Sequence, residues 1–402
     1  MYYRKPSYYD AFTCAAGSCP DTCCAGWNIV IDDKTMERYR SLPEDARRYV
    51  MSHVNEDEQV YIRYGERCAF LNGENLCDLY TCQGEEMFCK TCRRYPRHFE
   101  EYGNLIEAAL SLSCPVAANM IVNREDRDRY VVKNNEKKSP HKNEVDCVLL
   151  GSLLGARQHI FDVAGDRKLD IRRRMMRILV YGEKLQKLVY QYEKLGWRAR
   201  RKQCAAMFLL KTDFLTKKES LHAAEQAGKA DDMKEPQDGQ LRSVRQERYG
   251  LMRQYLDMLL GLENINDAWP ALIEDVRTNL YINHSGEQYM ELAQAFEEYM
   301  RARSYEYEHI LNYFIYAYFL GGVYDYHVQA MIKFAVLSVL VIREIGMSTW
   351  LKNEKRLTVE EQLRICWLFS RQIEHSDDNL TALEGILNAH PLFSEKNILK
   401  TI

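Results

Sequence analysis

Most of the chain after residue 146 repeats apolar residues at steps of three and four positions. This spacing gathers apolar side chains on one face of a helix. The expected helices cover residues 147–161, 171–195, 197–214, 214–227, 241–262, 271–281, 286–299, 305–319, 324–345, 358–373 and 379–388. The most apolar runs, 314–323 and 334–342, are far shorter than the ~20 residues that a bilayer-spanning helix needs. We therefore expect buried core helices and no membrane partner.

The first 122 residues show shorter and more mixed patterns. Residues 34–42 are predicted to form a helix with Asp32 or Asp33 as its cap, and 45–51 a second helix after a proline. Residues 59–64 alternate in polarity and predict a strand. The region therefore combines short strands with short helices.

An Asn-Gly turn at residues 72–75 predicts a hairpin between 68–71 and 76–80. Such a hairpin would place Cys68 close to Cys77. The two strands give a geometric reason for a shared thiol site.

A charged stretch at residues 123–146 has little to bury and is interpreted as a linker. The predicted fold class is therefore mainly α. A cysteine-rich, metal-binding domain with short strands would occupy residues 1–122, and an all-helical domain would occupy 147–402.

The composition is that of a soluble globular protein, with 46% hydrophobic and 28% charged residues. Lys and Arg total 55 against 58 Asp and Glu, so the net charge of −3 predicts no nucleic-acid partner. Residues 166–202 are locally basic. They are interpreted either as solvated helix faces or as a site for an anionic partner or cofactor.

The cysteines are the main chemical signal, because ten of the thirteen lie in the first 114 residues. The chain begins without an apolar signal segment, so we expect a cytoplasmic protein, and disulfides are rare in that reducing compartment. Metal binding is the favoured interpretation, and a redox or disulfide framework is the alternative. The ten residues are Cys14, Cys19, Cys23, Cys24, Cys68, Cys77, Cys82, Cys89, Cys92 and Cys114.

The spacing of these cysteines leaves the metal open. Zinc and iron–sulfur clusters both use four thiolates, and zinc ribbons use two C-x-x-C pairs. This chain has one such pair, Cys89 and Cys92, which disfavours a zinc ribbon. His53 or His98 could replace a sulfur ligand. Ten thiols exceed the needs of one site, so either two sites exist or some cysteines only pack.

Several common catalytic motifs are missing from the sequence. It contains no GxxxxGK[ST], no GxGxxG after a strand, no GxSxG and no HExxH. Reasoning from the residues alone therefore ends at a soluble protein with a thiolate metal site and a large helical domain.

Three segments, CPDTCCAGWNIVID, CAFL…LC…CKTCRRYPR and SLSCP, resemble the flagellin lysine-N-methylase family, one of the CxxCxxCC cysteine-cluster groups. The leading spacing here is C-x4-C-x3-CC. The resemblance implies methyl transfer from S-adenosylmethionine to lysines of flagellin, with a 4Fe–4S cluster as a second cofactor. The cysteines that it implies as metal ligands are Cys14, Cys19, Cys23, Cys24, Cys68, Cys77, Cys89, Cys92 and Cys114.

Charged and aromatic residues near these motifs give hypotheses about the chemistry. Arg93 and Arg97 could neutralise a thiolate cluster or hold the carboxylate of the cofactor. A solvated basic turn is the alternative. Asp32 and Tyr95 are candidate acceptors for the proton that the lysine amine must lose.

Two other functions remain open from the sequence. The chain could be a non-catalytic zinc- or iron-chelating protein with a helical interaction domain. It could also use zinc only to brace its fold, as a structural domain on a helical scaffold.

Overall fold

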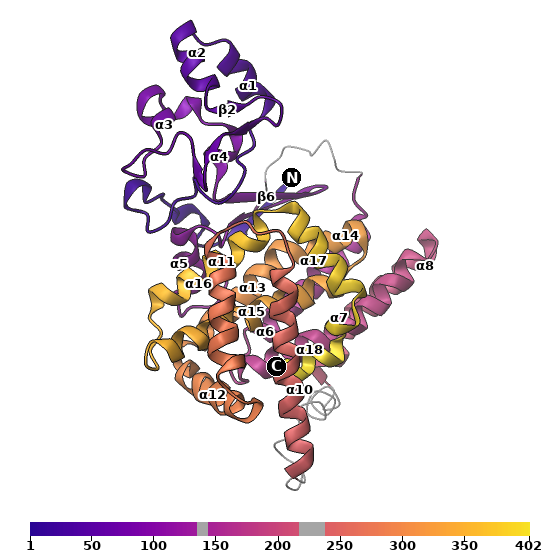
Figure 1. The fold of residues 1–402 in the computed structure, drawn as a ribbon. Helices are drawn as coiled ribbons and strands as arrows, with labels where there is room; N and C mark the ends of the chain where they lie inside the picture. Colours follow the sequence, from indigo (N-terminus) through magenta and orange to yellow (C-terminus); the bar gives the residue numbers. More distant parts are fainter. Residues whose placement is uncertain (135–143, 217–237) are drawn as a thin grey trace.

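The computed structural model describes residues 1–134, 144–216 and 238–402 of the chain (Figure 1). A small N-terminal lobe stands on one end of a larger helical body. Most of the helix expected at residues 214–227 lies outside the described residues. The mainly α fold class predicted from the hydrophobic pattern is confirmed.

The thiol lobe, defined here as residues 14–94, packs short helices and two-residue strands around its own apolar core. Its elements are η2 (Ala16–Ser18), α1 (Asp33–Arg40), α2 (Glu44–Met51), β2 (Val54–Asn55), β3 (Val60–Tyr61), β4 (Arg63–Tyr64), β5 (Arg67–Cys68), α3 (Asp78–Gln83), η3 (Glu85–Met87) and α4 (Lys90–Arg94). The helix predicted at 34–42 is α1, and Asp32 caps it by accepting a hydrogen bond from the Thr35 backbone N–H.

The predicted hairpin at residues 68–80 is right about its turn and wrong about both strands, because Cys68 belongs to β5, which pairs with β4. Leu71 bridges to Cys77 across the turn, and the Asn72 N–H donates to the Leu76 carbonyl. Helix α3 then begins at Asp78 instead of a strand. The turn alone is enough to bring Cys77 back toward Cys68.

A four-stranded sheet with the order β6-β7-β1-β8 joins the lobe to the body. Strand β1 (Tyr2–Pro6) runs parallel to β7 (Leu105–Leu110) and antiparallel to β8 (Tyr130–Asn134), and β6 (Arg97–Tyr102) pairs antiparallel with β7. Strand β8 lies inside the stretch expected to be a linker. The sheet packs into the large core of the helical body, so the packing groups the sheet with the helices and not with the lobe.

The helical body surrounds α15, a 25-residue helix whose side chains are nearly all buried. Its elements are η1 (Tyr9–Ala11), α5 (Pro115–Val122), α6 (Cys147–Ala164), α7 (Ile171–Glu193), α8 (Trp197–Thr216), α10 (Asp238–Leu260), α11 (Ala268–Val276), η4 (Arg277–Ile282), α12 (Gly286–Tyr299), η5 (Arg301–Arg303), α13 (Ser304–Tyr318), η6 (Phe319–Gly321), α14 (Gly322–Asp325), α15 (Val328–Lys352), α16 (Val359–Glu374), α17 (Asp377–Ala389), η7 (Pro391–Phe393) and α18 (Glu395–Thr401).

Two predicted helices are interrupted. The stretch 324–345 breaks at Tyr326, whose φ of 64° is left-handed, so α14 ends before α15 starts. The stretch 271–281 changes from α-helix to the π-helical turn η4, a feature often found at functional sites. None of the helices in the described parts of the chain has the length and apolar character needed to cross a bilayer.

Candidate thiol centres and a cleft in the helical body

All thirteen cysteines are free thiols in the structure. The ten N-terminal cysteines range from exposed to fully buried. The alternative of a disulfide framework therefore receives no support from the way the chain folds.

The inner thiol group consists of five cysteines that line one side of the core of the lobe: Cys24, Cys68, Cys77, Cys89 and Cys92. The backbone joins them directly, since the Cys68 N–H donates to the Cys24 carbonyl at 2.8 Å. The Cys92 N–H donates to the Cys89 sulfur at 3.5 Å. Three separate segments of the chain thus converge on one small region.

The thiols of the inner group also influence one another electrostatically. Burial raises the pKa of Cys68 to about 12, and repulsion from Cys24, Cys77 and Cys89 adds to this effect. A hydrogen bond from Cys92 lowers the pKa of Cys89 to about 6 despite its burial. The pKa of Cys24 is likewise lowered to about 7, chiefly by its hydrogen bond with Cys23. Hydrogen bonding between neighbouring thiols therefore makes Cys24 and Cys89 easier to deprotonate than Cys68.

Asp32 fixes the segment that carries Cys89 and Cys92. Its carboxylate accepts the Lys90 N–H at 2.8 Å while it caps α1. Burial raises the pKa of Asp32, but the hydrogen bonds from Lys90 and Thr35 outweigh it and leave the pKa low. The proposed role of Asp32 as proton acceptor stays a prediction, and the structure assigns it a positioning role.

The two predicted cofactor arginines have partners within the protein. Arg93 Nη2 donates to the carbonyls of Glu86 and Phe88 at 3.2 and 3.3 Å. The guanidinium of Arg97 lies over the Phe12 ring, 5.1 Å from its centroid. Their role in holding a cofactor stays a prediction.

The junction thiol group consists of four cysteines where the lobe meets the body: Cys14, Cys19, Cys23 and Cys114. Burial first raises the pKa of Cys114, and repulsion by Cys19 and Cys14 raises it further. The pKa of Cys23 is raised by its hydrogen bond with Cys24, by burial, and by repulsion from Cys24, Cys14 and Cys114.

Arg371 of α16 ties this group to the helical body. Its Nη1 lies 2.8 Å from the Asp21 carboxylate and its Nε donates to the Ser113 carbonyl at 3.1 Å, next to Cys114. The residue is 2% exposed, and its Nη2 has no hydrogen-bond partner in the described parts of the chain. Sequence reasoning missed Arg371, because nothing in the pattern of α16 relates it to cysteines some 350 positions away.

Tyr95 lies beside the junction thiol group. Its hydroxyl is 3.0 Å from Ser113 Oγ, and its pKa is raised by burial, by Cys23 and by Cys114, although Arg371 opposes this. A phenol with a raised pKa is a weak proton acceptor at neutral pH. Its catalytic role stays a prediction.

The thiol spacing bears on the metal that each group fits. Zinc with Zn–S bonds of about 2.3 Å holds its sulfurs about 3.8 Å apart. Among the residues that the structure describes, no three cysteine sulfurs all lie within 4.8 Å of one another. In an iron–sulfur cluster the thiolates bind different irons. The chemistry of the donors fits both metals, and in neither group are three sulfurs as close together as the ligands of one zinc ion.

A large cleft of about 1300 Å³ opens in the helical body. Its walls come from the loop before α7, from the starts of α7 and α13, from α10, α12 and η5, and from α15 and α18. Helix α12 lies at the end of the body away from the thiol lobe (Figure 1). The cleft mixes arginines and lysines with glutamates, which suits a ligand that carries charges of both signs.

Arg248 gives the cleft a buried cationic group. It is 4% exposed and lines the cleft, and neither its Nε nor its Nη2 has a hydrogen-bond partner among the described residues. Its side chain is hydrogen-bonded with Tyr289, and the Glu344 carboxylate attracts its positive charge. The Glu344 carboxylate accepts hydrogen bonds from Tyr281 and Tyr289, both at 2.7 Å, so it is already satisfied. The Nε–Nη2 edge of a guanidinium matches the two oxygens of a carboxylate.

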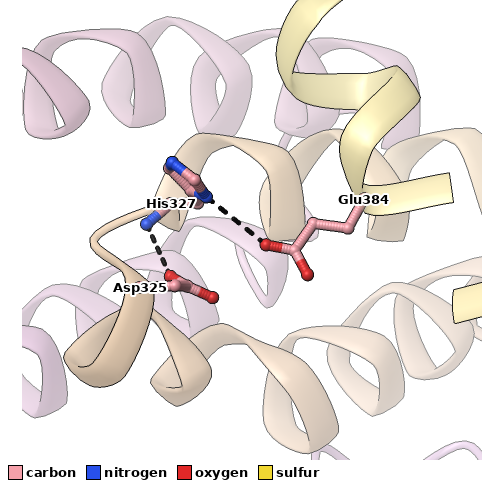
Figure 2. A group of neighbouring side chains, drawn as sticks. All are labelled: Asp325, His327 and Glu384. Carbon is pink, nitrogen blue, oxygen red and sulfur yellow. Dashed lines mark hydrogen bonds and ion pairs between the residues drawn. The ribbon is translucent and has the colours of Figure 1, made fainter. Parts of the chain in front are cut away.

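A third polar cluster is formed by Asp325, His327 and Glu384, whose ligand atoms all lie within 4.8 Å of one another (Figure 2). The backbone N–H of His327 donates to the Asp325 carboxylate at 2.7 Å, and the ring Nδ1 of His327 lies 3.5 Å from the Glu384 carboxylate. These contacts brace the break between α14 and α15. We assign the cluster a structural role.

The fold and its sites define a class of protein, namely a helical body that bears a charged cleft and carries a thiol-rich lobe. Residues 157–401 match the family described as "FliB lysine N-methylase C-terminal domain", and the chain belongs to this family. The family that the N-terminal motifs indicated is thereby confirmed, by residues that lie outside those motifs.

Relatives share shorter segments. A "Lysine-N-methylase" of Salmonella choleraesuis (strain SC-B67) is 28% identical over 131 residues, which are 30% of this chain and 33% of the relative. The "Flagellar biosynthetic protein FliU" of Salmonella muenchen is 27% identical over 135 residues, 30% of this chain and 78% of the relative. The chain thus spans about a third of the length of the lysine-N-methylases that it matches. No solved structure matches the chain.

Proposed function

We propose that the protein is a lysine N-methyltransferase that uses S-adenosylmethionine and acts on flagellin. The observation that carries the proposal is the position of the cleft. Its lining residues run from Arg167 to Ile402, so all but the last fall within the span that matches the methylase family. The names of the relatives, lysine-N-methylase and flagellar biosynthetic protein, support the reaction and the substrate.

The cleft has the size and the charges for this cofactor. Small-ligand pockets usually measure about 300–1,000 Å³, so a cleft of about 1300 Å³ has room for a cofactor and a lysine side chain. Arg248 would hold the carboxylate of the cofactor through its unpartnered edge. Nearby glutamates would attract its ammonium group. When bound, S-adenosylmethionine supplies an electrophilic methyl group.

The protein side of the reaction concerns the lysine amine. A free lysine has a pKa of about 10.4, so it arrives protonated and must lose a proton before it can act as a nucleophile. Glu297 and Glu298 line the cleft and would attract the incoming ammonium. Asp32 belongs to the thiol lobe, and Tyr95 lies at the junction between the lobe and the body. Either residue could accept the proton only if methyl transfer took place beside the lobe and not in the cleft.

The inner thiol group would hold a 4Fe–4S cluster, with four of its five cysteines as ligands. A bound cluster would cross-link three segments of the lobe and add electron-transfer capacity. The cleft is lined by residues of the body and not of the lobe. We therefore propose that the cluster supports the lobe, while the body binds the methyl donor.

The test is a methyl-transfer assay. The full chain, purified without oxygen, is incubated with isotopically labelled S-adenosylmethionine and flagellin, and the modified residues are identified by peptide mass. Methyl groups on flagellin lysines are the expected result. Flagellin whose lysines have been chemically dimethylated beforehand is the control and should take up much less label. If the protein keeps its metal and its fold but transfers no label, the result would instead favour the alternative function, a non-catalytic zinc- or iron-chelating protein.

A further inference from the structure

We propose that the junction thiol group binds a metal centre of its own, with Cys14, Cys19, Cys23 and Cys114 as its thiolate ligands, separate from the centre in the inner thiol group. The proposal concerns the number of metal centres, so it does not depend on methyl transfer.

The first argument is the division of the nine thiols. Cys23 and Cys24 are consecutive, yet Cys24 packs against the core of the lobe with the inner cysteines and Cys23 does not. In agreement, the thiol of Cys23 interacts electrostatically with Cys14 and Cys114, whereas that of Cys24 interacts with Cys77 and Cys89. Four thiols remain at the junction after the inner group is counted. Four thiolates are the complete ligand set of a zinc ion or of an iron–sulfur cluster.

The second argument is the buried charge beside the junction group. Arg371 is 2% exposed, and its Nη2 has no partner among the described residues. A buried guanidinium needs its charge balanced. The Asp21 carboxylate, 2.8 Å away, balances it partly, and the charge of Arg371 also acts on Cys23. A metal held by four thiolates carries net negative charge, and Arg371 is positioned to offset it.

The third argument is that the chain packs the segments that carry these cysteines against one another. The Cys19 sulfur lies 3.0 Å from the Asp21 carbonyl, and Arg371 links Asp21 to Ser113. The Trp27 indole N–H donates to the Cys23 carbonyl at 2.8 Å, and its ring packs at a tilt against His375, with 4.5 Å between the ring centroids. These contacts hold the loop of residues 14–23 against α5 and α16.

Four thiolates select a metal that binds sulfur well. Thiolates bind zinc and iron–sulfur clusters, and binding replaces the thiol protons. Either metal would fasten the lobe to the body, because Cys114 precedes α5 of the body whereas the other three cysteines belong to the lobe.

The experiment measures iron, zinc and acid-labile sulfide in the full chain purified without oxygen. The variants are Cys14→Ser for the junction group and Cys68→Ser for the inner group. Cys82→Ser and Cys147→Ser are matched controls, because both residues are exposed thiols outside the two groups. Circular dichroism verifies that each variant is folded. Cys14 is exposed, so its substitution leaves the core intact.

We expect Cys14→Ser and Cys68→Ser each to lose about half of the bound metal, the double variant to lose nearly all of it, and the controls to lose none. Sulfide lost with the iron identifies a cluster, and zinc lost without sulfide identifies a zinc site. Retention of the full metal content in Cys14→Ser overturns the proposal. Loss of all the metal in that variant overturns it too, because it would mean one shared centre. Both outcomes concern the number of metal centres, so they can be distinguished from a failure of the methyl-transfer assay.

Discussion

Asp21 and Arg371 are 350 positions apart in sequence, and the carboxylate Oδ2 of one lies 2.8 Å from the Nη1 of the other. Trp367 donates its indole N–H to the same carboxylate at 3.0 Å. This contact joins the thiol lobe to α16 of the helical body. Arg371 is almost fully buried. Breaking the ion pair would therefore leave a buried guanidinium without a counter-ion, and that cost is the main reason why the pair matters for stability.

Replacing Asp21 with alanine should destabilise the full chain. The change leaves a buried guanidinium without its counter-ion, which costs about 3 kcal/mol. Urea unfolding followed by circular dichroism measures the effect. Glu56→Ala is the control, because it breaks the ion pair between Glu56 and Arg40, and both of these side chains are about half exposed. Loss of such a surface pair should change the free energy of unfolding by less than about 1 kcal/mol. Equal effects of the two substitutions would contradict the importance given to Asp21.

Arg248→Lys should weaken binding of S-adenosylmethionine while preserving the positive charge. Lysine cannot present two parallel N–H groups to a carboxylate, so we expect an affinity about ten times lower, equivalent to about 1.4 kcal/mol. Isothermal titration calorimetry measures the dissociation constant. Arg301→Ala, at an exposed arginine of the cleft, is the control and should have little effect.

The same measurement on Arg93→Ala compares the two candidate cofactor sites. Arg93 lies in the thiol lobe and already donates to two carbonyls. A large loss of affinity in Arg93→Ala, with none in Arg248→Lys, would move the cofactor site from the cleft to the lobe.

Gly182→Ala should destabilise the body, because Gly182 lies where α7 crosses α15. A methyl group there would overlap Gln329 and would approach Ile332 Cδ1 to 2.5 Å. Overpacking of this kind costs about 1–3 kcal/mol. Gly151→Ala in α6 is the matched control, because the added methyl group meets nothing within 4 Å. Its higher helix propensity should stabilise the protein by up to about 1 kcal/mol, and both changes are read from thermal unfolding.

His375 should make stability depend on pH. Burial, and secondarily Arg371, lower its pKa from 6.5 to about 3 in the folded chain. The unfolded chain therefore binds a proton below pH 6.5 that the folded chain does not, so this contribution is complete above pH 6.5 and is lost as the pH falls toward 3. The slope is up to about 1.4 kcal/mol per pH unit.

The measurement is the free energy of unfolding of the wild type and of His375→Gln between pH 7 and pH 5. The wild type should lose stability more steeply over this interval, whatever the difference between the two proteins at pH 7. Parallel curves would show that His375 is protonated in the folded state or lies in a more solvated environment.

The helical periodicity predicted most of the body correctly, because helices such as α6, α7 and α12 bury one face and expose the other. It missed β1, whose five residues are too few to show a pattern and which finds its partners, β7 and β8, more than 90 positions away. The periodicity also predicted one continuous helix across Tyr326, where the structure has a break. The spacing of apolar residues carries no signal for a residue with a left-handed backbone conformation.

The cysteines were recognised from their clustering, whereas the cleft was not predicted. Its lining residues come from six α-helices, from η5 and from the loop before α7, and they carry no local motif. The local excess of basic residues at 166–202 was the one available signal, and Arg167, Arg172 and Arg174 of that segment do line the cleft.

Local patterns in the sequence were enough to determine the helical class, the cap of α1 and the presence of a thiol-rich region, because each depends on residues a few positions apart. Only the tertiary structure decided that the thiols separate into two groups and that Arg371 and Arg248 face the junction group and the cleft. Those relationships depend on burial and on charge balance between distant segments, and these forces act only once the chain has packed.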